Sequence, residues 1–223
     1  TTYGVPRIAF INKFDRVGSD FWNAIETMKD RLGSNAVAIQ VPMGEEDHFW
    51  GLIDLVTMTA WDFKEDAKGM IYPEAMDAIP DEFADIVAEK REELLDAASN
   101  YSDELMETIL EDGEVTPELL KSAIRAGVLA NELNPVLVGS AYKNKGIQEL
   151  LDAVIDYLPS PLDVAEIDGT NLKGEPEVRH ADPKEPFAAL AFKIMTDPYV
   201  GKLTYIRVYS GQAEAGSYVY NSV

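Results

Sequence analysis

Cysteine is absent from this chain of 223 residues, and basic residues are few. Without cysteine there can be no disulfide framework, no thiolate metal site and no cysteine nucleophile. The 19 lysine and arginine residues face 40 aspartate and glutamate residues, which gives a net charge of -21. Such acidity disfavours broad contact with phosphates, so we expect little direct binding of nucleic acid. The charge indicates either simple solubility or a docking face for a basic partner protein.

Long hydrophobic runs are also missing. No apolar run approaches the roughly 20 residues that span a bilayer, and the first residues lack the layout of a signal peptide. Hydrophobic residues make up 46% of the chain, which is enough for a real core. We therefore expect a folded, soluble protein without membrane contacts. The way in which the sequence begins suggests an internal piece of something longer.

Two apolar runs predict neighbouring strands of a parallel sheet. Residues 7–11 read as a buried strand that ends at Asn12, and a helix with apolar residues at helical spacing follows, ended by Gly33. Residues 135–139 read as a second buried strand, followed by a loop and another helix. Strand, loop and helix form the α/β unit, and open sheets of this kind bind ligands where strand ends lie side by side.

The segments between and after these runs have a different character. AVAIQVPMG, HFWGLIDLVTMTAWDF and GMIYPEAM predict a small antiparallel sheet, followed by helices over residues 80–100, 102–110 and 116–128. Ser102 and Thr116 stand where N-caps belong. The stretch from Leu158 to Pro186 reads as a linker that packs partly as coil. FAALAFKIM, KLTYIRVYSG and SYVYNSV then predict strands too few to close a barrel.

The most informative residues are Asn12-Lys13-Phe14-Asp15. The carboxylate of Asp15 can accept two parallel hydrogen bonds from the ring N–H and amino group of guanine, whereas adenine offers no such pair. Lys13 can lay its methylene stem across the base, and Asn12 would hold the loop together. Alone, the motif could merely shape a solvated turn. Its position at a strand end, opposite a loop that begins Ser140-Ala141-Tyr142 and whose backbone N–H groups could meet the guanine carbonyl, favours base recognition.

These segments resemble elongation factor G, a bacterial translational GTPase. The resemblance rests on VPRIAFINKFDRVGSDF, VLVGSAYKNKGIQELLDAVIDYLPSPLDV and EPFAALAFKIMTDPYVGKLTYIRVYSG, in that order, and covers essentially the whole chain. The guanine motif of that family matches Asn12, Lys13 and Asp15, and its serine-alanine motif matches Ser140 and Ala141. Tyr142 replaces the lysine that follows this alanine in many small GTPases.

The resemblance implies an α/β fold with three parts. These are the C-terminal part of a P-loop GTPase G domain (residues 1–34 and 135–158), an α+β insert of that domain (35–134) and, after a linker (159–185), the first strands of a translation-factor β-barrel (186–223), which would be truncated. It also implies GTP or GDP with Mg²⁺ as cofactors of the parent protein, a cytoplasmic location and the ribosome as partner.

A specific partner surface is also implied. In elongation factor G, helices of the insert meet the ribosomal stalk protein. The matching acidic positions on the expected helices are Glu89, Glu92, Asp103, Glu104 and Glu107.

The phosphate-handling motifs are missing from the sequence. No Gly-x-x-x-x-Gly-Lys-Ser/Thr occurs; Gly201-Lys202 reads as a turn between strands, and Asp66-Ala67-Lys68-Gly69 reads as a β-turn inside the insert. Without these motifs the chain has no magnesium ligand and no catalytic residue for GTP hydrolysis. We expect this fragment alone to be inactive and to hold no nucleotide tightly, and we expect no metal site in it.

The parent protein would couple GTP hydrolysis to movement of transfer and messenger RNA on the ribosome. Two alternatives stay open. One is a related ribosomal GTPase, either a ribosome-protection protein or a peptide-release GTPase. The other is a nucleotide-free acidic interaction module.

Overall fold

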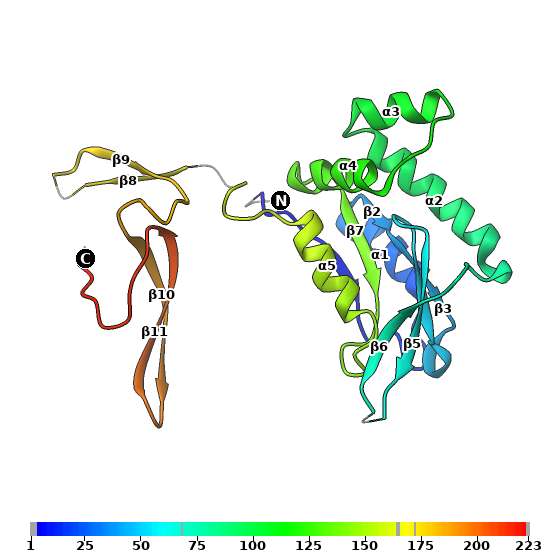
Figure 1. The fold of residues 1–223 in the computed structure, drawn as a ribbon, viewed down its shortest axis with the longest axis horizontal. Helices are drawn as coiled ribbons and strands as arrows, with labels where there is room; N and C mark the ends of the chain where they lie inside the picture. The colour runs from blue at the N-terminus through cyan, green and yellow to red at the C-terminus, as the bar shows by residue number, and fades with distance from the viewer. Residues whose placement is uncertain (1–3, 68, 164–165, 172, 222–223) are drawn as a thin grey trace. The chain divides into compact units, whose positions relative to one another are not determined.

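The computed structural model describes residues 4–67, 69–163, 166–171 and 173–221. The chain divides into two compact units, Thr1–Leu158 and Pro159–Val223 (Figure 1). Within the described residues, no helix is both long enough and apolar enough to cross a membrane.

The first unit is built around a short parallel sheet. Strands β1 (Ala9–Ile11), β7 (Asn134–Val138) and β2 (Ala36–Ala38) lie in the order β1-β7-β2, and both pairs are parallel. The structure thus confirms that the two apolar runs are adjacent. Ile11 lies opposite Val138, so β1 and β7 end at the same edge of the sheet.

Helices α1 (Phe21–Leu32) and α5 (Ile147–Tyr157) follow β1 and β7, as the sequence predicts. The side chain of Asp20 accepts a hydrogen bond from the N–H of Asn23 and so caps α1. Gly33 ends this helix at a φ of 59°, a left-handed conformation that glycine adopts without steric cost.

The insert contains the expected antiparallel sheet. Its strands pair in chain order, and the connection between β3 and β4 contains the short helix η1 (Glu46–His48). The strands are β3 (Gln40–Met43), β4 (Gly51–Asp54), β5 (Thr59–Glu65) and β6 (Ile71–Ala75).

One expectation about the insert sheet is wrong. The segment AVAIQVPMG was expected to lie wholly in the antiparallel sheet, but its first three residues form β2 of the parallel sheet. The N–H of Ile39 donates to the carbonyl of Val136, and the side chain of Gln40 accepts from the N–H of Val138. These bonds hold the segment to β7 until the chain turns into β3. Local composition could not separate the two sheets, because all of these residues are compatible with either one.

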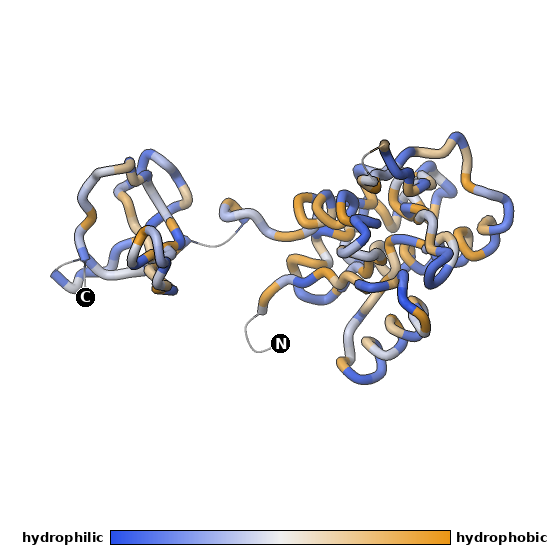
Figure 2. The backbone as a smooth tube through the Cα atoms, turned by 90° about the horizontal axis from the view of Figure 1, so that it is seen from below, coloured by the Kyte–Doolittle hydropathy of each residue, from blue (hydrophilic) through white to orange (hydrophobic). Residues whose placement is uncertain are grey.

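The three insert helices are confirmed. After the short helix η2 (Asp81–Phe83), the structure has α2 (Ala84–Ser99), α3 (Asp103–Leu110) and α4 (Pro117–Leu129). The side chains of Ser102 and Thr116 cap α3 and α4 as expected. The backbone tube of the first unit alternates between hydrophobic and hydrophilic residues along its helices (Figure 2), as in helices that cover a core on one side.

Two buried clusters support this unit. One lies under the insert helices and includes Leu94, Leu105, Leu120 and Ile124. The other joins the parallel sheet to the insert sheet. Its members include Phe14, Phe21, Phe49, Leu52, Val136 and Val138. Both sheets therefore contribute side chains to this second cluster, so they share one hydrophobic core.

The second unit contains two antiparallel hairpins. Strands β10 (Ala188–Asp197) and β11 (Gly201–Ser210) form the hairpin that the sequence predicts, with the chain reversing between Asp197 and Gly201. The segment SYVYNSV (217–223) was expected to form a strand; residues 217–221 form none and pair with no strand of the described part of the chain, and residues 222 and 223 lie outside the described residues.

The stretch expected to be a linker contains a hairpin that the sequence analysis missed. Strands β8 (Ile167–Thr170) and β9 (Pro176–Arg179) pair there. The side chain of Asn171 closes their turn by accepting hydrogen bonds from the N–H groups of Lys173 and Glu175. Asparagine in such a turn is a known local signal, but the polar flanks hide the strands.

Removal of the α4 cap tests the local account of this helix. Thr116→Ala deletes the hydroxyl that satisfies the N–H of Leu119. We expect the variant to lose about 1 kcal/mol of unfolding free energy, measured by urea denaturation, because an N-terminal donor is left unpaired. Thr116→Ser keeps the hydroxyl and should unfold like the unchanged protein. Equal loss in both variants would contradict a capping role.

Candidate functional site

The loops after β1 and β7 lie side by side and are joined by backbone hydrogen bonds. The N–H of Gly139 donates to the carbonyl of Ile11 over 3.0 Å, and the N–H of Phe14 donates to the carbonyl of Gly139 over 3.1 Å. The side-chain oxygen of Asn12 accepts from the N–H groups of Lys13 (2.8 Å) and Ala141 (3.0 Å). Asn12 therefore ties the two loops together.

Side chains of the first loop alternate between solvent and core. Lys13 has a φ of 63° and is exposed, whereas the next residue, Phe14, is only 2% exposed. The ring of Phe14 meets those of Phe21 and Phe49 edge to face, at centroid distances of 6.3 and 5.1 Å. Because Phe14 is anchored in the core, the positions of Lys13 and Asp15 on either side of it are fixed.

Asp15 is a buried, ionised acceptor. Its side chain is 7% exposed, and its carboxylate lies 3.3 Å from the ammonium group of Lys143. Burial alone would raise the pKa of Asp15, but the facing Ser140 hydroxyl and the Lys143 ammonium together outweigh it and hold the pKa below its usual value. At neutral pH the group is therefore a carboxylate that can accept hydrogen bonds but donates none.

The second loop is a tight turn. Ser140 and Lys145 form a two-bond bridge across it, of 2.9 and 3.0 Å, and the residues between them reverse the chain. A side chain at Gly139 would come within 2.3 Å of the carbonyl of Lys145, and one at Gly146 within 2.5 Å of the carbonyl of Val138. Both positions thus require glycine for the turn to sit against β7.

The backbone donors of this turn are divided between the protein and solvent. The N–H of Ala141 is used by Asn12, while the N–H of Tyr142 has no hydrogen-bond partner among the described residues. The Tyr142 side chain is 93% exposed. Ser140 is 1% exposed, and its hydroxyl lies near enough to Asp15 to lower the pKa of that carboxyl, although it makes no well-aligned hydrogen bond within the described part of the chain. The Ser140 hydroxyl lies near Asp15, and the N–H of Tyr142, two residues further along the same turn, is not used within the described part of the chain.

The structure adds residues that the sequence analysis missed. Lys143 pairs with Asp15, Asn144 donates to the carbonyl of Ile71 in β6 over 2.7 Å, and Lys145 donates to the carbonyl of Phe49. Their only sequence signal is the run Lys143-Asn144-Lys145 directly after the predicted motif, and that run does not show which partners it meets.

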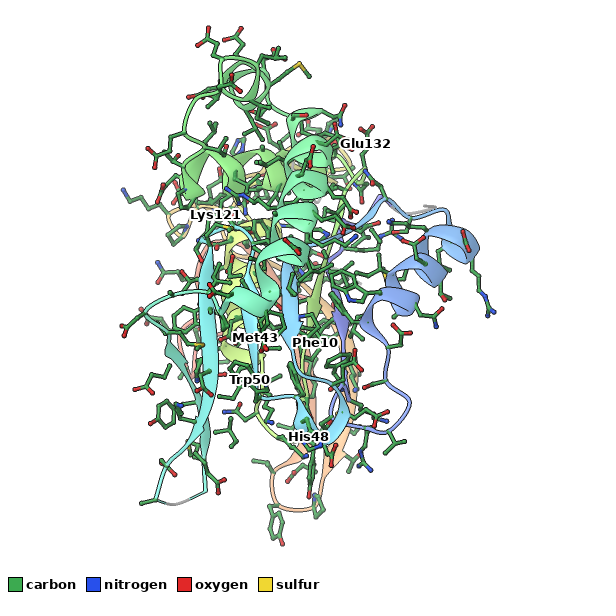
Figure 3. All side chains as sticks on the ribbon, turned by 90° about the vertical axis from the view of Figure 1, so that its right-hand side faces the viewer. Phe10, Met43, His48, Trp50, Lys121 and Glu132 are labelled. Atoms are coloured by element: carbon green, nitrogen blue, oxygen red, sulfur yellow. The ribbon has the colours of Figure 1, made fainter. Side chains whose placement is uncertain are left out.

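The acidic residues expected to bind a partner lie elsewhere. Glu89 and Glu92 are exposed on α2, and Asp103, Glu104 and Glu107 are exposed on α3. Helix α3 lies at the end of the first unit opposite the loop after β7 (Figure 1). In Figure 3, His48 of η1 lies near the bottom of the view, and Lys121 of α4 lies higher, toward the insert helices.

Together these groups suit a flat ring that carries adjacent donors on one edge. The Asp15 carboxylate can accept from two adjacent N–H groups, and a free backbone N–H of the turn can donate to a carbonyl oxygen. The sequence provides no comparable set for phosphates, since no Gly-x-x-x-x-Gly-Lys-Ser/Thr is present.

Such a site, at the carboxyl ends of neighbouring parallel strands, is typical of nucleotide-binding α/β domains. The sequence profile of the elongation factor Tu GTP binding domain matches residues 1–160. The chain therefore belongs to this family of translational GTPase domains.

A solved structure supports the same fold. The chain superposes on the crystal structure of a protein from Thermus thermophilus with a TM-score of 0.71 and 27% sequence identity. The match covers 96% of this chain and 29% of the other. This chain therefore spans less than a third of the length of that protein.

The ion pair of Asp15 can be tested by titration. Lys143→Met removes the ammonium group, so we expect the pKa of Asp15 to rise, measured by carboxyl ¹³C NMR. In the unchanged protein the lowered pKa of Asp15 stabilises the fold at pH values above the pKa of the unfolded state, about 3.9. This stabilisation is lost as the pH falls through the lower pKa of the folded state. Lys29→Met, which removes an exposed lysine of α1, should leave the titration unchanged. An unchanged pKa in Lys143→Met would contradict the role of the pair.

Proposed function

We propose that this chain is the guanine-reading part of a longer translational GTPase that resembles elongation factor G. The observation that carries the proposal is the buried carboxylate of Asp15, held ionised and facing the turn of Ser140, Ala141 and Tyr142. Family membership supplies the nucleotide class, and the geometry supplies the means of reading the base.

In this proposal each residue has a separate role. Asp15 accepts the ring N–H and the amino group of guanine, and the open N–H of Tyr142 meets the carbonyl oxygen, with Ala141 beside it. Lys13 covers one face of the base with its stem. Asn12 and Ser140 keep the two loops in register.

The rest of the reaction belongs to other segments of the complete protein. A phosphate loop would hold the β- and γ-phosphates with Mg²⁺, and a further segment would orient the attacking water. This chain contributes base selection and the insert, and by itself it would not hydrolyse GTP. The complete protein would use GTP hydrolysis on the ribosome to drive translocation of transfer and messenger RNA. The segments MTDPYVGKLTYIRVYSG and LPSPLDV support elongation factor G over the related ribosomal GTPases.

Base selection is tested by changing the acceptor pattern. Asp15→Asn replaces one oxygen by an amino group, which matches xanthine, where a carbonyl stands in place of the amino group of guanine. In the complete protein we expect GDP affinity to fall about a hundredfold or more and xanthosine diphosphate to become the better ligand. Fluorescence titration measures both.

The matched control is Asp30→Asn, on the exposed face of α1. It removes the same charge and should leave both affinities unchanged. If Asp15→Asn bound GDP as tightly as the unchanged protein, Asp15 would not read the base. If the unchanged protein bound ADP as well as GDP, the proposed function would fail.

A second proposal concerns the acidic faces of α2 and α3. Glu89, Glu92, Asp103, Glu104 and Glu107 are exposed, and by resemblance they would face the ribosomal stalk protein. Complementary charge chiefly raises the rate of association.

Charge reversal tests this surface. In the complete protein, Glu92→Lys with Glu107→Lys should lower stalk-dependent kcat/KM for GTP at least about fivefold at low salt, and less at high salt. Asp168→Lys with Glu214→Lys changes the net charge equally, at exposed positions of the second unit, and serves as control. If both double variants had the same stalk-dependent kcat/KM, the proposal that α2 and α3 bind the stalk protein would be wrong.

A further inference from the structure

The turn of residues 140–145, which faces Asp15, contacts the insert as well as the parallel sheet. Its internal bonds, between Ser140 and Lys145, give it shape but not position. The bonds from Ala141 to Asn12 and from Lys143 to Asp15 join it only to the other base-facing loop. Beyond β7 itself, its remaining side-chain contacts lead into the antiparallel sheet.

Lys145 provides the first of these anchors. Its ammonium group donates to the carbonyl of Phe49 and lies 5.6 Å from the ring centroid of Phe49 and 6.0 Å from that of Phe63. The two rings are themselves packed edge to face at 5.4 Å. Burial lowers the pKa of Lys145, the charge of Lys143 adds to this effect and Asp15 opposes it. A cation held against aromatic faces and a carbonyl has little freedom to move.

Asn144 provides the second anchor. Its amide donates to the carbonyl of Ile71 at the start of β6, over 2.7 Å. The residue has a φ of 54°, in the left-handed region that asparagine tolerates better than most residues. Figure 1 shows the loop after β7 beside β6, which agrees with this contact.

The insert also holds the first loop. The carboxylate of Glu46, in η1, accepts from the N–H of Gly18 over 2.7 Å, and Phe49 packs against Phe14, the residue before Asp15. One side of the insert therefore touches both loops. Phe49 contacts both loops, through the ring of Phe14 and the ammonium group of Lys145.

We propose that the antiparallel sheet of the insert sets the geometry of base recognition, with Lys145 and Asn144 as positioning residues that fix the turn relative to Asp15. Neither residue needs to touch the nucleotide. Base reading requires donors on the turn and acceptors on Asp15 to meet one ring, and small displacements weaken such contacts strongly. This inference rests on the proposed recognition of guanine.

The experiment compares nucleotides that differ at single positions, in the complete protein. GDP and its 6-thio analogue differ only in the atom that the turn would bind, and GDP and IDP differ only in the amino group that Asp15 would bind. In Lys145→Met we expect GDP affinity to fall about tenfold. The preference for GDP over 6-thio-GDP should fall toward one, whereas the preference for GDP over IDP should stay.

Matched variants separate positioning from stability. Lys145→Arg keeps a cation and a donor and should restore the 6-thio discrimination, while Lys29→Met removes an exposed lysine and should change nothing. Asn144→Gly keeps the left-handed turn but loses the bond to Ile71, and should behave like Lys145→Met. Asn131→Gly is its control, because Asn131 also has a positive φ (64°) and donates to a backbone carbonyl, that of Gly4.

The outcomes are distinguishable. A merely structural role would lower the affinity for all three nucleotides equally in Lys145→Met, together with the unfolding temperature, and this result would overturn the inference. So would unchanged 6-thio discrimination in both Lys145→Met and Asn144→Gly. If the unchanged protein did not prefer GDP to ADP, the proposed function itself would fail. This preference is measured on the unchanged protein, without any variant.

Discussion

The register between β1 and β7 is the constraint on which the site depends. Ile11 lies opposite Val138, so Asn12 and Gly139 leave the sheet at the same level and their loops can exchange hydrogen bonds. A slip of one residue would exchange Val136 and Val138 with Leu137 between the two buried clusters on either side of β7, and would separate the loops. Packing of the core therefore fixes the register of β1 and β7, and the hydrogen bonds between the two loops depend on that register.

Within this frame, burial of the Asp15 side chain, which is 7% exposed, carries an electrostatic cost. The structure offsets it chiefly with groups from the opposite loop, the Ser140 hydroxyl and the Lys143 ammonium. A charge shielded from water interacts more strongly with whatever donors reach it, and its desolvation has already taken place before a ligand arrives. The same contacts that keep Asp15 ionised also hold the two loops together.

Local sequence signals predicted the elements with clear boundaries. Buried runs gave β1 and β7, Ser102 and Thr116 marked helix starts, and Asn12 to Asp15 marked the loop. The failures are features set by distant partners. Residues 36–38 join the parallel sheet through pairing with β7, about a hundred positions away, and Lys145 meets Phe49 across a separation of 96 residues. No local pattern encodes such contacts, because a lysine after a turn is equally suited to solvent.

The insert lies in the sequence between the two loops, and this order has a structural consequence. The chain that leaves β1 passes through α1, returns to the parallel sheet at β2, and reaches β7 only after the antiparallel sheet and helices α2 to α4. The cluster that contains Phe14, Phe49 and Val138 is therefore both the floor of the site and the junction of the insert. Helix α3 lies at the opposite end and contributes nothing to that cluster (Figure 1). We therefore expect a change in the packing of the antiparallel sheet to alter the loops after β1 and β7, and a change on the surface of α3 to leave them unaltered.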